Sequence, residues 1–225
     1  MDHQIMERII RFNSKQEASL GLSQKIVSII KENETQKKLS KILLSGGSTP
    51  LLTYEYLSQS DINFSTTQFG LVDDRFVPIN DIHSNEGCIR EIFREIDNFN
   101  LRSMVGEATD YGQSIQDCDV SYQIFNDADI AILGMGNDGH FASLFPGDKN
   151  SEFGLLNGIP ACLGTNAPSE PKQRITMNLA ALLKVEHRIL LIIGADKLAK
   201  LEIAKTESTP ISYIVNQLTA IYYAP

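Results

Sequence analysis

An ionisable pair, Asp138 and His140, stands in a glycine-rich stretch between residues 128 and 147. The stretch reads ADIAILGMGNDGHFASLFPG. Its apolar run, residues 130–133, predicts a buried strand, and the glycines after it predict a tight turn. Histidine titrates nearest neutral pH of all side chains, so one interpretation is general acid–base chemistry. The other is an ordinary turn that contains a structural histidine.

A dinucleotide site is a further interpretation of the same turn, because Gly134, Gly136 and Gly139 satisfy G-x-G-x-x-G. That fingerprint needs a long helix after the third glycine and an acidic residue about twenty positions on. Pro146 cuts the following segment short, and residues 159–164, IPACLG, contain no acid. The sequence therefore disfavours a nicotinamide site.

A second glycine-rich turn, SGGSTP at residues 45–50, lies between a predicted strand and the predicted helix LLTYEYL. Thr49 suits an N-cap and Pro50 the first helical position. The backbone N–H groups of Gly46 and Gly47, the hydroxyls and the helix dipole would converge on an anion. A P-loop needs a lysine where Ser48 stands, so one phosphate group fits better than a nucleoside triphosphate. The alternative is a plain capped turn.

Three charged side chains stand near other predicted strand ends. Asp73 and Arg75 belong to DDRFVP, after a strand at residues 69–72. They predict either a surface ion pair or a carboxylate with a phosphate clamp. Lys197 falls in the first turn of a predicted helix at 195–205, where a cation opposes the helix dipole.

The elements that position these residues alternate along the chain. Helices are predicted at 14–34, 51–57, from Ser84 or Asn85 to about 94, 112–125, 178–185, 195–205 and from 210; strands at 39–44, 69–72, 101–105, 130–133, 188–193 and near 221. Residues 1–12 suit an edge strand or lead-in. Residues 148–173 are poorly patterned, with a possible strand at 161–163, and Arg174 leads into a strand. This predicts a single α/β domain over 1–225, doubly wound, with a mostly parallel sheet and helices on both faces.

Bulk properties exclude several classes of protein. The chain has 225 residues, a formal net charge of -8 and no basic block, so no nucleic-acid partner is expected. Cys88, Cys118 and Cys162 lack metal-ligand spacing and suit a reducing cytosol. The N-terminus lacks a signal-peptide core and no run is long enough to span a bilayer. We therefore expect a cytoplasmic protein with no membrane partner.

Taken in order, SGGSTP, DDRFVP with Ser84-Asn85 downstream, LGMGNDGHFASLFPG, PKQRIT and GADK resemble the motifs of 6-phosphogluconolactonases. These belong to the wider glucosamine-6-phosphate isomerase superfamily, and the resemblance runs from about Leu43 to Ser212. It implies a doubly wound α/β fold and hydrolysis of 6-phospho-D-glucono-1,5-lactone to 6-phosphogluconate. It implies a small sugar phosphate as the partner, no metal or organic cofactor, and a monomer or weak homodimer.

By the same resemblance, His140 is the general base, and Asp138 and Asp73 share the polar work around it. The phosphate would meet Gly46, Gly47, Ser48, Thr49, Arg75, Lys197 and Arg174. Negative charge on the carbonyl oxygen needs donors, and either backbone N–H groups of the Gly134–Gly139 turn, with Gly136 and Gly139 as the candidates, or side chains are expected to supply them. The chain departs from the family pattern at Asp74, where D-E-R has glutamate, and at Phe141, where threonine is usual.

Two alternatives remain. Glucosamine-6-phosphate isomerases share the phosphate loop and a D-G-H turn, but resemble N-E-P-G where this chain has LFPG, and M-D-E-Y where it has VDDR. A non-catalytic sugar-phosphate sensor is the other alternative, since fold alone does not settle function. Such regulators need a DNA-binding helix-turn-helix, and only about forty residues precede SGGSTP.

Overall fold

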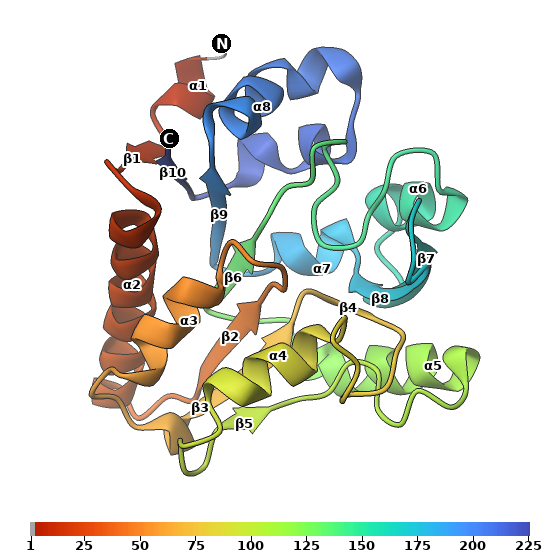
Figure 1. The fold of residues 1–225 in the computed structure, drawn as a ribbon. Helices are drawn as coiled ribbons and strands as arrows, with labels where there is room; N and C mark the ends of the chain where they lie inside the picture. Colours follow the sequence, from red (N-terminus) through yellow and green to blue (C-terminus); the bar gives the residue numbers. More distant parts are fainter. Residues whose placement is uncertain (1–2) are drawn as a thin grey trace.

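A seven-stranded parallel sheet forms the centre of the computed structural model, which describes residues 3–225 (Figure 1). Its strand order is β1-β10-β9-β6-β2-β3-β5. The strands are β1 Ile9–Arg11, β2 Ser40–Leu44, β3 Thr67–Leu71, β5 Asn100–Leu101, β6 Ile130–Leu133, β9 His187–Ile193 and β10 Ala220–Ala224. The central strands are continuous apolar runs and are buried, as a sheet covered on both faces requires.

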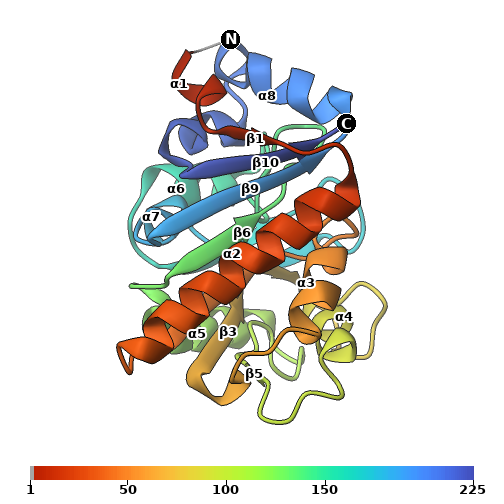
Figure 2. The same ribbon diagram turned by 90° about the vertical axis from the view of Figure 1, so that its left-hand side faces the viewer.

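Helices cover both faces of this sheet. Figure 2 shows α2 lying across one face, with α5, α6 and α7 behind the sheet on the other. The helices are α1 His3–Met6, α2 Lys15–Thr35, α3 Leu51–Ser58, α4 Asn85–Ile92, α5 Tyr111–Ser121, α6 Lys149–Leu156, α7 Leu179–Leu183 and α8 Ala195–Glu207. The predicted doubly wound, mostly parallel α/β fold is confirmed. No helix in the described part of the chain is long and apolar enough to cross a membrane.

The chain reverses its direction of travel between β2 and β6, which are neighbours in the sheet. From β2 it proceeds through β3 to β5 at one edge. From β6 it proceeds the other way, through β9 to β10. The loops that leave the carboxyl ends of β2 and β6 therefore diverge and leave a crevice between them, which is the usual ligand position in open α/β sheets.

A second, antiparallel sheet was not predicted. It has the order β4-β8-β7 and consists of β4 Asp73–Arg75, β8 Gln173–Met177 and β7 Cys162–Asn166. Arg75 is the register partner of Arg174, although nearly one hundred residues separate them in sequence. The segment 148–173 is also more ordered than its pattern indicated, since it contains both α6 and β7. These short elements depend on partners distant in sequence.

Some predicted boundaries were wrong. The turn before α3 is not capped by Thr49: the helix begins at Leu51, Pro50 is the N-cap residue and makes no side-chain cap bond. The helix predicted from 210 is two 3₁₀ turns, Pro210–Tyr213 and Val215–Gln217. Two further 3₁₀ turns lie at Phe64–Thr66 and Tyr122–Phe125, the second replacing the end of the helix predicted at 112–125.

Candidate active site

A cavity of about 280 Å³ opens at the carboxyl ends of β2, β6 and β9. Its walls come from residues 45–50, 134–136 and 191–193, together with Asp73, Arg75, Asn85, His140, Ala142 and Lys197. The two glycine-rich turns therefore face one another across the crevice at the switch point. Most of the residues singled out in the sequence meet here.

His140 and Asp138 form a close pair on the β6 side. The His140 Nδ1 atom lies 2.6 Å from Asp138 Oδ1, and the same oxygen accepts the His140 backbone N–H at 3.1 Å. Burial alone would raise the pKa of the Asp138 carboxyl, but these bonds from His140 outweigh it and lower the pKa. Nothing among the described residues bonds Nε2, so this nitrogen is free while Nδ1 faces a carboxylate. The ring packs on Phe145, with centroids 4.6 Å apart.

The turn that carries His140 requires both of its later glycines. A Cβ at Gly136 would lie 2.2 Å from the His140 ring, and Gly139 has φ +79° with Thr209 pressed against it. The prediction that their N–H groups hold an oxyanion is not supported. Gly136 N–H donates to the His140 carbonyl at 2.9 Å, and Gly139 N–H donates to the Gly136 carbonyl at 3.1 Å. Both donors are used to close the turn itself.

The SGGSTP turn is fixed at its start by a tyrosine. The Tyr54 hydroxyl on α3 accepts the Ser45 N–H at 3.0 Å and donates to the Ser45 carbonyl at 2.8 Å. Gly47 has φ +83°, a conformation that favours glycine. Gly46 lies directly against Asn85, since a Cβ there would be 1.9 Å from Asn85 Oδ1. Backbone of this turn can therefore approach a ligand closely.

Asp73 is nearly buried at the start of β4, where it joins two parts of the wall. Its Oδ2 accepts the hydroxyl of Ser143 at 2.6 Å, and its carbonyl accepts Asn85 Nδ2 at 3.0 Å. Ser143 follows His140 by three residues. Asp73 is therefore connected to the histidine turn through its carboxylate and to α4 through its backbone carbonyl.

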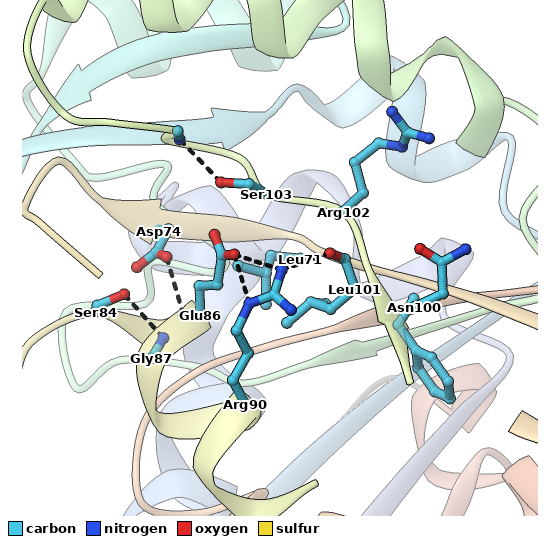
Figure 3. Close-up of polar contacts among 12 residues, drawn as sticks. Leu71, Asp74, Ser84, Glu86, Gly87, Arg90, Asn100, Leu101, Arg102 and Ser103 are labelled. Atoms are coloured by element: carbon cyan, nitrogen blue, oxygen red, sulfur yellow. Dashed lines mark hydrogen bonds and ion pairs between the residues drawn. The ribbon is translucent and has the colours of Figure 1, made fainter. Parts of the chain in front are cut away.

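The neighbouring Asp74 does not line the cavity. Its side chain lies at the N-terminus of α4 (Figure 3). Its Oδ1 accepts the backbone N–H groups of Arg75 and Asn85, each at 2.7 Å, and its Oδ2 accepts that of Glu86 at 3.0 Å. Burial raises the pKa of this carboxyl to about 7, against the three N–H donors, which lower it. Ser84 caps the same helix separately, through the N–H three residues on, as predicted for Ser84 or Asn85.

Two of the three predicted cations line the cavity. Arg75 holds the His83 carbonyl at 2.7 Å, and Lys197 in the first turn of α8 donates to the Met135 carbonyl at 2.7 Å. Burial lowers the pKa of Lys197, opposed by Asp196 and Asp138. A lysine drawn to a neutral carbonyl retains two donors for an anion.

Arg174 does not line the cavity. It is buried beside Arg75 in the small sheet, and its Nε and Nη1 atoms have no hydrogen-bond partner among the described residues. Burial and then Arg75 lower the pKa of Arg174, while Asp73 and Asp74 raise it. A direct contact between Arg174 and substrate therefore stays a prediction, and the structure brings it only as far as its neighbour on β4.

The sequence analysis did not place Asn85 or Tyr54 in the site. Asn85 was considered only as a possible helix cap, and Tyr54 only as one residue of a helix. Neither carries a local signal for its role, because each depends on where α3 or α4 lies in the fold. Among residues 3–225, no group of three or more His, Cys, Asp or Glu side chains is arranged to bind a metal ion.

The fold and the site define a family. Residues 13–222 match the family described as glucosamine-6-phosphate isomerases/6-phosphogluconolactonase, and the chain belongs to it. A curated relative, "6-phosphogluconolactonase" of Xylella fastidiosa (strain 9a5c), is 30% identical over 210 residues, which cover 91% of this chain and 88% of that one. A relative of the same name from Pseudomonas aeruginosa is 29% identical over 197 residues, 86% of this chain and 83% of that one. The crystal structure of a 6-phosphogluconolactonase from Shewanella baltica OS155 is 27% identical and superimposes with a TM-score of 0.88, over 96% of this chain and 97% of that one.

Proposed function

We propose that this protein is a 6-phosphogluconolactonase, which hydrolyses 6-phospho-D-glucono-1,5-lactone to 6-phosphogluconate. One observation carries the proposal: a single cavity is lined by His140, which is paired with Asp138, by the glycine-rich turn at residues 45–50 and by the cations Arg75 and Lys197. We call residues 45–50 the anion loop. The names of the relatives support the same activity. The reducing compartment suggested by three free cysteines fits a cytoplasmic enzyme of sugar-phosphate metabolism.

In this proposal His140 is the general base. Asp138 accepts a hydrogen bond from Nδ1–H, which leaves Nε2 with a lone pair for the cavity that His140 lines. Water gives its proton to Nε2 as its oxygen bonds the lactone carbonyl carbon. The ring C–O bond then breaks, and the protonated imidazole returns the proton to the leaving ring oxygen. The products are a carboxylic acid, which ionises, and a free hydroxyl.

The phosphate of the substrate lies at the other end of the cavity, on Gly46, Gly47, Ser48 and Thr49. Arg75 and Lys197 supply positive charge, and Arg174 adds its charge from behind Arg75. This anchor is remote from the reacting carbon, so its binding energy orients the ring and lowers the entropic cost of attack. Because the Gly136 and Gly139 N–H groups are engaged within the turn, donors other than these two stabilise charge on the carbonyl oxygen.

The sister activity, isomerisation and deamination of glucosamine 6-phosphate, remains the alternative. It needs an acid near the histidine to open the sugar ring, and the stretch after His140 is LFPG, residues 144–147, without one. Phe145 instead packs on the His140 ring. The lactonase is therefore the better fit to these residues.

The test is the rate of lactone opening, coupled to oxidation of 6-phosphogluconate and corrected for spontaneous hydrolysis. His140→Ala should lower kcat by about 10²–10⁴-fold, the usual contribution of a general base, while circular dichroism and thermal unfolding show that it folds. Ammonia release from glucosamine 6-phosphate is followed in parallel. A His140→Ala variant with undiminished lactonase activity would eliminate the base assignment, and ammonia release without lactonase activity would establish the isomerase.

A further inference from the structure

Asp74 contributes no atom to the cavity wall, yet it is the most thoroughly bonded carboxylate next to it. The residue is 1% exposed, and its two oxygens accept three backbone N–H groups from two elements. Figure 3 shows the bond with Glu86. One donor, Arg75, belongs to β4. The other two, Asn85 and Glu86, are the first residues of α4. Asp74 therefore fastens the start of α4 to the strand that carries Asp73 and Arg75.

Asn85 transmits this attachment to the anion loop. Its backbone N–H is held by Asp74, and its side chain reaches the cavity, where Nδ2 donates to the Asp73 carbonyl at 3.0 Å. Its Oδ1 lies against Gly46, where even a methyl group would not fit. The side-chain amide of Asn85 thus limits where the Gly46 backbone can lie, and Asp74 keeps Asn85 in place.

We propose that Asp74 is a positioning residue for the anion-binding end of the cavity, acting through Asn85 on Gly46 and through the β4 backbone on Asp73 and Arg75. The inference rests on the proposed function and deepens it: the ligand is the phosphate of the substrate. Asp74 does not touch that ligand. It fixes the distance between the glycine turn and the arginine that would hold opposite sides of one phosphate group.

Ser84 provides a matched control, because it caps the same helix without reaching β4. Its hydroxyl accepts the Gly87 N–H at 3.0 Å, and it is as buried as Asp74 (Figure 3). Ser84→Ala removes one cap bond from α4, and Asp74→Asn removes the acceptor of the Glu86 N–H, since an amide NH₂ then faces another donor. Both variants weaken the end of α4, but only Asp74→Asn loosens its attachment to the site.

The experiment measures KM and kcat for the lactone, the Kd of inorganic phosphate by calorimetry, and the thermal midpoint of each variant. We expect Asp74→Asn to raise KM and the phosphate Kd about tenfold with a smaller change in kcat, because binding through the anion loop is lost. Ser84→Ala should lower the thermal midpoint comparably and leave KM and Kd within about twofold of wild type. Equal KM and Kd in Asp74→Asn and wild type would overturn the proposal, as would an equal rise in both variants.

Asn85→Ala provides a second route if Asp74→Asn does not fold. It removes the amide between Asp73 and Gly46, so it should reproduce the rise in phosphate Kd, and an unchanged Kd would also overturn the proposal. The phosphate measurement separates this inference from the proposed activity. A wild-type protein that binds phosphate but does not open the lactone refutes only the activity. A wild-type protein that neither binds phosphate nor opens the lactone refutes both proposals. An active protein whose KM and phosphate Kd are unaffected by Asp74→Asn refutes only the positioning role.

Discussion

At the scale of single residues, the His140–Asp138 pair is the feature on which the proposed chemistry depends. The carboxylate lies 2.6 Å from Nδ1, and its lowered pKa keeps it ionised at neutral pH. In the proposed mechanism it favours the tautomer that has the proton on Nδ1 and the lone pair on Nε2. The proposed base therefore depends on both residues, because a change of tautomer or a rotation of the ring would remove it.

Asp138→Asn should lower kcat by at least about tenfold and leave KM nearly unchanged. The amide can donate to Nδ1, which would move the ring proton to Nε2 and block proton abstraction. Steady-state lactonase kinetics measure the effect. The matched control is Asp117→Asn on α5, an exposed acid bonded to Gln113 at 2.8 Å, which should retain full activity. Equal kcat in the two variants would contradict the tautomer argument.

Asp74 should also leave a signature in the pH dependence of stability. Its folded pKa of about 7 is above its ordinary value of 3.8, so its protonated form stabilises the fold below about pH 4, and this contribution is lost as pH rises through about 7. The free energy of unfolding of wild type relative to Asp74→Asn should therefore fall by on the order of 2–4 kcal/mol over that range. Urea unfolding at several pH values measures this difference, and a flat difference would show that the carboxyl titrates normally.

At the scale of elements, α3 holds the anion loop through one hydroxyl. Tyr54 is fully buried and satisfies both the N–H and the carbonyl of Ser45, the first residue of the loop. Tyr122 also makes two hydrogen bonds through one hydroxyl. It accepts the Leu71 N–H at 3.0 Å and donates to the Arg102 carbonyl at 3.1 Å. The two tyrosines therefore form a matched pair that differs in the segment each one holds.

Tyr54→Phe and Tyr122→Phe should each cost about 1–3 kcal/mol, because each leaves two buried backbone groups without a partner. Only Tyr54→Phe should also raise KM for the lactone, by severalfold, since only this variant frees the start of the anion loop. Denaturant unfolding gives the first quantity and steady-state kinetics the second. A similar rise in KM for both variants would mean that general loosening, rather than the loop, controls binding.

At the scale of the whole molecule, burial is greatest in the middle of the seven-stranded sheet. Ile132 on β6 has no exposed surface and strands on both sides, whereas Ile10 on the edge strand β1 is 44% exposed. The cavity lies at the ends of the central strands, each of which is paired with a strand on both sides. Placing a site there keeps its loops anchored on rigid supports.

Ile132→Ala should therefore destabilise the protein by about 2–5 kcal/mol, and Ile10→Ala by less than about 1 kcal/mol. The reason is that only the first substitution leaves a cavity in a closely packed core. Urea unfolding measures the loss of stability in each variant, and the same Ile→Ala substitution is compared at both positions. Comparable losses would indicate that the sheet unfolds from its edge and its centre with equal ease.

Much of the fold was predictable because its signals are local. The apolar run of β6, the periodicity of α2 and the alternation of strands with helices each occupy a few consecutive residues, and they specified the doubly wound sheet. The small sheet was not predictable in the same way. β4 has three residues and no pattern of its own, and it exists because β8 lies beside it.

By itself, the sequence determined which residues are candidates for the proposed chemistry: the histidine with its aspartate, the two glycine turns and the cations after the strands. Their types and their places at strand ends are local properties. Only the tertiary structure decided that Asn85 presses on Gly46, that Asp74 holds α4, that Arg174 lies behind Arg75, and that the Gly136 and Gly139 N–H groups are already engaged. These depend on contacts between segments far apart in the chain, which form only when burial of the common core brings the segments together.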